Sequence, residues 1–127
     1  MTKVLVVDDN EKNLKLLRVI LQHNGCEVIE AANGKEGVFK SKEHAPHLIF
    51  MDIQMPVMDG ISALKILRSD ESTRHIPVIA LTSYAMKGDM ERIIEEGFNG
   101  YIAKPISAVE LVGVIRKYIV KQSGETI

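Results

Sequence analysis

The feature of this sequence that most constrains its fold is a regular alternation of apolar runs and helical segments. Short runs rich in β-branched and aliphatic residues predict five buried strands, at residues 3–7, 26–31, 48–51, 76–81 and 100–103. Segments with apolar residues at helical spacing follow them and predict helices at 10–23, 33–43, 61–68, 85–96 and 107–119. Apolar strands that are separated by helices are typical of a parallel sheet with both faces covered.

Five such units predict an α/β protein with a three-layer, flavodoxin-like (βα)5 fold. Right-handed crossovers favour the strand order 2-1-3-4-5 with helices on both faces. At this length, residues 1–121 are expected to form one domain. Residues 122–127 are expected to be a frayed C-terminal tail.

Composition excludes several classes of protein. Sixteen basic and seventeen acidic side chains leave a net charge of −1, which argues against direct binding of nucleic acid. No apolar run approaches the length of a membrane span, and acids interrupt the N-terminus where a signal peptide would be apolar. The single cysteine, Cys26, has no disulfide partner within the chain and is predicted to be a small buried residue. We therefore expect a cytoplasmic domain.

Polar residues follow four of the five predicted strands. They are Asp8, Asp9, Asp52, Thr82, Ser83 and Lys104. The carboxyl ends of parallel strands lie along one edge of the sheet, where open α/β sheets bind their ligands. Each residue alone has an ordinary structural explanation, such as a helix cap or a turn. Their joint placement at one edge predicts a common site.

The residue types at this edge suit phosphoryl transfer. Crowded carboxylates repel one another, and Mg²⁺, which prefers oxygen ligands, relieves that repulsion. The Lys104 ammonium can pair with a phosphoryl oxygen, and the Thr82 hydroxyl can donate to another. Asp52 would act as the nucleophile and form an aspartyl phosphate.

Four segments at these positions carry a resemblance to a known family. They are Val7–Asn10, Met51–Gly60, Ala80–Ser83 and Ala103–Pro105. Over nearly its whole length the chain resembles the receiver domain of two-component response regulators. It is similar to stand-alone bacterial receivers of the cell-division type and to receivers of hybrid histidine kinases.

The resemblance implies a phosphorelay role. Asp52 would accept a phosphoryl group from a phosphohistidine on a histidine kinase or a histidine phosphotransfer protein. Asp9, Asp52 and the backbone carbonyl of Gln54 would bind Mg²⁺, and Asp8 would help through water. Lys104 would pair with the phosphoryl group. Catalysis would extend only to the protein's own phosphorylation and dephosphorylation.

The resemblance also implies a conformational switch. Thr82 would be the switch hydroxyl and Tyr101 the aromatic switch residue, and a cis peptide is expected at Lys104-Pro105. Gln54 and Tyr84 would tune the phosphate lifetime. The surface formed by the fourth helix, fifth strand and fifth helix would bind a downstream protein, with the chain a monomer or a phosphorylation-dependent dimer.

Two other functions remain open from the residues. A haloacid-dehalogenase-type phosphatase also forms an aspartyl phosphate, but it needs a second Asp two positions after the nucleophile, where this chain has Gln54. A phosphorylation-independent interaction module would not need Asp9, Asp52, Thr82 and Lys104, all of which are present.

Overall fold

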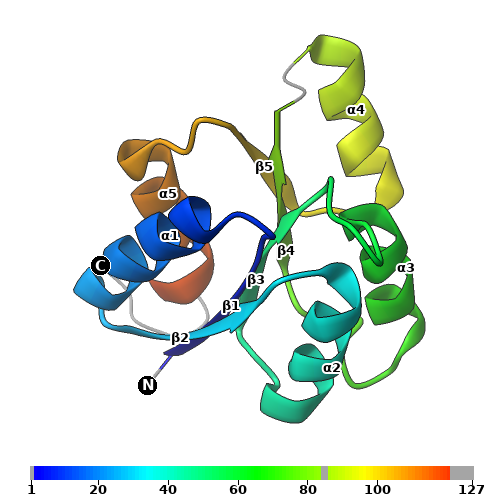
Figure 1. The fold of residues 1–127 in the computed structure, drawn as a ribbon, viewed down its shortest axis with the longest axis horizontal. Helices are drawn as coiled ribbons and strands as arrows, with labels where there is room; N and C mark the ends of the chain where they lie inside the picture. Colours follow the sequence, from blue (N-terminus) through cyan, green and yellow to red (C-terminus); the bar gives the residue numbers. More distant parts are fainter. Residues whose placement is uncertain (1, 84–85, 121–127) are drawn as a thin grey trace.

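The computed structural model describes residues 2–83 and 86–120 (Figure 1). Its strands are β1 (Thr2–Val7), β2 (Cys26–Ala31), β3 (Leu48–Asp52), β4 (Val78–Thr82) and β5 (Gly100–Ala103). Its helices are α1 (Glu11–His23), α2 (Gly34–His44), α3 (Gly60–Ser69), α4 (Lys87–Glu96) and α5 (Ala108–Ile115), which continues into the π-helical turn η1 (Arg116–Val120). All strand pairs are parallel and the order is β2-β1-β3-β4-β5, which confirms the predicted fold and topology.

Two apolar layers hold the helices against the sheet. Helices α1 and α5 cover one face, and α2, α3 and α4 cover the other (Figure 1). Successive strand residues point to opposite faces, so Val4 and Val6 of β1 pack in the first layer while Leu5 and Val7 pack in the second. This two-sided burial explains why the strands are apolar throughout.

The fourth strand was predicted two residues too early. Ile76 and Pro77 precede β4, which begins at Val78 and ends at Thr82. Proline has no backbone N–H to donate to a neighbouring strand. The Pro77 carbonyl still accepts a hydrogen bond from the Ile49 amide (3.0 Å), so the chain enters the sheet there without forming strand.

Most helix ends agree with the predicted signals. The side chains of Asn10, Asn33 and Ser107 cap α1, α2 and α5. Gly25 and Gly97 take left-handed φ values of 81° and 113° after α1 and α4. The predicted start of the fourth helix at Ala85, together with Tyr84 and the tail at 122–127, lies outside the described residues. Within the described part of the chain, no helix is both long and apolar enough to cross a membrane.

Close backbone packing fixes the loop between β3 and α3. The Gly60 amide donates to the Ile53 carbonyl (2.9 Å), and the Gly34 amide at the start of α2 donates to Met58 (3.0 Å). A Cβ on Gly60 would overlap the backbone carbonyl oxygen of Asp52. The end of β3 therefore keeps its position only while residue 60 has no side chain.

This contact makes Gly60→Ala a test of the loop. We expect the free energy of unfolding to fall by about 2 kcal/mol or more, because backbone atoms must move to admit the methyl group. Gly113→Ala is the matched control, since no atom lies near its Cβ position in α5. The control should gain about 0.5–1 kcal/mol from helix propensity. Equal effects in chemical denaturation would contradict this account of the loop.

Candidate functional site

Three acidic side chains converge at the carboxyl ends of β1 and β3. These strands are neighbours in the sheet, with Val7 paired to Met51, so the residues that follow them emerge side by side. Carboxylate oxygens of Asp8, Asp9 and Asp52 lie within 4.8 Å of one another. Asp8 and Asp52 are buried and Asp9 is exposed. The predicted gathering of these acids is therefore present in the structure.

Lys104 reaches this cluster from the end of β5. Its ammonium lies 3.0 Å from Asp52 Oδ2 and 3.3 Å from Asp8 Oδ2. The backbone amide of Lys104 donates to the Thr82 carbonyl (2.7 Å), which fixes the chain beside the end of β4. The peptide bond between Lys104 and Pro105 is cis, as the resemblance implied. A cation is thus shared between two buried carboxylates.

Hydrogen bonds orient both buried acids. Asp8 accepts from the Asn10 amide (2.9 Å) and from Asn13 Nδ2 (3.2 Å), and Asp52 Oδ1 accepts from the Gln54 amide (3.2 Å). Asn13 was not identified in the sequence. Its signal was its place in the first turn of the helix that follows Asp8 and Asp9, where a side chain can reach back to the strand end.

Burial raises the pKa of Asp52 to about 6. The hydrogen bond from Lys104 opposes this shift, and the negative charge of Asp8 reinforces it. Burial also acts to lower the pKa of Lys104, but its hydrogen bond to Asp52 and the charges of Asp8 and Asp52 outweigh burial and raise it. The lysine therefore remains charged, whereas burial makes the ionised form of Asp52 energetically unfavourable.

The donor set around the acids suits a hard divalent cation. A pocket of about 350 Å³ is lined by Asp9, Asn10, Asn13, Asp52, Gln54, Ser83 and Lys104. Its carboxylate oxygens are the ligands that Mg²⁺ prefers, and the exposure of Asp9 leaves room for the waters that Mg²⁺ retains. The residues present therefore fit this ion.

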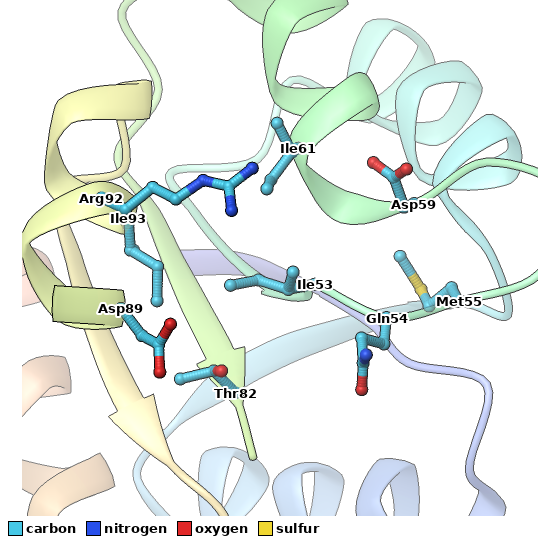
Figure 2. Close-up of a pocket in the computed structure, with 9 residues that line it drawn as sticks. All are labelled: Ile53, Gln54, Met55, Asp59, Ile61, Thr82, Asp89, Arg92 and Ile93. Carbon is cyan, nitrogen blue, oxygen red and sulfur yellow. The ribbon is translucent and has the colours of Figure 1, made fainter. Parts of the chain in front are cut away.

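The two predicted switch residues differ in burial. Thr82 is the last residue of β4 and is buried. With Gln54 it lines a second pocket, beside α4 (Figure 2). Tyr101 lies on β5 paired with Ala80, and its side chain is 37% exposed. The structure therefore places the hydroxyl inside the molecule and the aromatic ring at its surface.

The raised pKa of Asp52 predicts a pH-dependent stability. A folded-state pKa above the unfolded value means that the folded protein holds this proton more tightly, so stability falls as pH rises from about 4 to about 6. Measured with a chelator, wild type should lose on the order of 2 kcal/mol more than Asp52→Asn between pH 4 and 7. Glu71→Gln, at an exposed acid, is the control and should follow wild type. Parallel curves for wild type and Asp52→Asn would contradict the burial cost.

Comparison with known proteins agrees with this geometry. Residues 4–116 match the response regulator receiver domain family. The chain is 48% identical over 120 residues to the polar-differentiation response regulator DivK of Brucella ovis, covering 94% of this chain and 98% of that protein.

Solved structures show the same fold. One is the receiver domain of sensor histidine kinase PA1611 from Pseudomonas aeruginosa, which has a magnesium ion coordinated in its active site cleft. It is 35% identical to this chain with a TM-score of 0.85, over 93% of this chain and 97% of that one. The chain also matches a chain in the co-crystal structure of the Saccharomyces cerevisiae histidine phosphotransfer signaling protein Ypd1 and the receiver domain of Ssk1. The two are 32% identical with a TM-score of 0.89, over 95% of this chain and 90% of that one. The chain belongs to the family of response regulator receiver domains.

Proposed function

We propose that this protein is a phosphorelay switch that accepts a phosphoryl group on Asp52 from a phosphohistidine of a histidine kinase or a histidine phosphotransfer protein. The observation that carries the proposal is the ammonium of Lys104, placed 3.0 Å from Asp52 and 3.3 Å from Asp8 beside an exposed third acid. A nucleophile, a cation and ligands for a metal are thus gathered in one pocket.

The transfer needs Asp52 in its ionised form. One carboxylate oxygen forms the new P–O bond while the P–N bond of the phosphohistidine breaks, and the imidazole leaves with the electron pair of that bond. Lys104 then exchanges its contact with Asp52 for one with a phosphoryl oxygen while Asp8 holds it in place. Thr82 donates its hydroxyl to another phosphoryl oxygen.

Mg²⁺ would be held by Asp9, Asp52 and the backbone carbonyl of Gln54, with Asp8 acting through water. When bound, it neutralises charge on the carboxylates and on the phosphoryl oxygens. Support comes from the clustered carboxylates and from the magnesium ion in the related PA1611 receiver. The protein's own residues supply orientation, and Lys104 supplies the permanent positive charge.

The phosphorylated form would act through a change of surface. Thr82 moves toward the phosphoryl group and Tyr101 turns inward. The relative populations of the conformations adopted by the face of α4, β5 and α5 then change. A downstream protein would bind this face in the cytoplasm, with the chain a monomer or a phosphorylation-dependent dimer. The Ypd1 complex of the related Ssk1 receiver supports a histidine phosphotransfer protein as the donor.

No specific observation favours either of the two alternative functions. Gln54 occupies the position where the phosphatase needs its second acid, and an amide cannot act as a general acid. A module that works without phosphorylation would not require a lysine ion pair to two buried carboxylates.

Phosphorylation by a small donor tests the acceptor directly. With Mg²⁺ and acetyl phosphate, mass spectrometry should find one phosphoryl group on Asp52 and none on Asp52→Asn. Chelation of Mg²⁺ should abolish the modification, because the charge at the site is then not neutralised. Modification at another residue, or steady turnover of many phosphoesters, would contradict the proposal.

Replacing Lys104 tests its electrostatic role. Lys104→Met should slow phosphorylation by about a hundredfold, as expected when a group that stabilises developing charge is removed. Lys15→Met, at an exposed position of α1, is the matched control and should react at the wild-type rate. Circular dichroism verifies that both variants fold. An undiminished rate for Lys104→Met would assign the lysine a purely structural role.

A further inference from the structure

A pocket of about 390 Å³ separates the start of α4 from the loop between β3 and α3 (Figure 2). Its walls carry apolar side chains from both sides, Ile53, Met55, Ile61 and Ile93. Gln54 lines both this pocket and the pocket of the acids, and Thr82 lies on the wall of β4. The space under α4 therefore adjoins the pocket of Asp52, with Gln54 between the two.

One acid of α4 faces this space. Asp89 lies in the first turn of α4, is half-buried, and projects toward Thr82 in Figure 2, whereas Arg92 extends toward Ile61. Among the described residues, no cation forms an ion pair with Asp89. Within the described residues, the Asp89 carboxylate thus points toward Thr82 (Figure 2) without an ion-pair partner.

The two ends of α4 are held differently. At the C-terminal end, Arg68 of α3 donates to the Gly97 carbonyl (3.2 Å) and to Asn99 Oδ1 (2.8 Å), and Ile93 and Phe98 are buried. At the N-terminal end the capping residue is Met86, which makes no side-chain cap and is 76% exposed. A force on the first turn can therefore move that end while the other stays in place.

We propose that Asp89 is the positioning residue through which charge on Asp52 displaces α4. The proposal rests on the phosphoacceptor function above. Phosphorylation replaces the single negative charge of the Asp52 carboxylate with a phosphoryl group of about −1.5 to −2, which extends outward from a cluster that also contains Asp8 and Asp9. Asp89 is repelled, and the uncapped first turn of α4 moves away from Thr82 about the end held by Arg68. In the unmodified protein the same repulsion opposes phosphorylation, because coupling between two sites is reciprocal.

Beryllofluoride, which mimics a phosphoryl group on Asp52, provides the test in the presence of Mg²⁺. Removing the charge with Asp89→Asn should raise beryllofluoride affinity about fivefold, the lower end of ordinary coupling between sites. The same variant should lose at least half of the beryllofluoride-induced change in amide hydrogen exchange over residues 89–92. Asp89→Glu, which restores the charge, should restore both properties.

Glu91→Gln is the matched control, since Glu91 lies on the same helix but is exposed and does not line the pocket. It should behave as wild type. A different result would contradict the inference. If Asp89→Asn binds beryllofluoride with unchanged affinity, and its amide hydrogens exchange faster by the same factor with and without beryllofluoride, Asp89 only stabilises the terminus of α4. Failure of wild type to bind beryllofluoride at all would contradict the phosphoacceptor function itself.

Discussion

The ion pairs of Lys104 with Asp8 and Asp52 are the interaction on which the site depends. Two buried carboxylates at neighbouring strand ends repel each other, and burial alone already makes the ionised form of Asp52 costly. A single ammonium within 3.3 Å of both keeps the acids together without neutralising them fully. In the proposed function, the remaining negative charge would attract a cation to the pocket and would make Asp52 the nucleophile.

Backbone geometry protects this balance. The hydrogen bond from the Lys104 amide to the Thr82 carbonyl fixes the lysine beside β4. On the other side, Gly60 allows α3 to start directly against the Asp52 carbonyl. The sheet thus carries the acids, and the short connections that follow β3 and β5 position what surrounds them.

Helix α4 differs from the rest of this framework. Helices α1, α2, α3 and α5 all have a side-chain cap, whereas Met86, the N-cap residue of α4, makes no such hydrogen bond. Its polar sequence fits a helix with one buried end and one end over a pocket. The Arg68 contacts hold its C-terminal end, and in the proposed displacement the first turn is the end that would respond to the acids.

The alternation of apolar runs and helical segments was enough to predict the layers, the parallel sheet and its order, because burial on both faces leaves few topologies. Asp8, Asp9, Asp52, Thr82 and Lys104 could be predicted as one group because parallel strands present their carboxyl ends at a common edge. The late start of β4 was missed because the apolar pattern of a strand continues through Pro77. The pattern does not reveal that the Pro77 carbonyl accepts a hydrogen bond from β3 while its nitrogen has no hydrogen to donate.

Contacts between segments distant in the sequence required the tertiary structure. Asn13, Arg68 and Asp89 are ordinary polar helix residues in the sequence, and their roles arise only when their helices pack against particular strand ends. The exposure of Tyr101 and the raised pKa of Asp52 likewise depend on how much protein covers each side chain. Local sequence determined which groups reach the edge of the sheet, because strand periodicity and turn chemistry are local. Only packing decided their distances, burial and charge balance, since these depend on neighbours contributed by the whole chain.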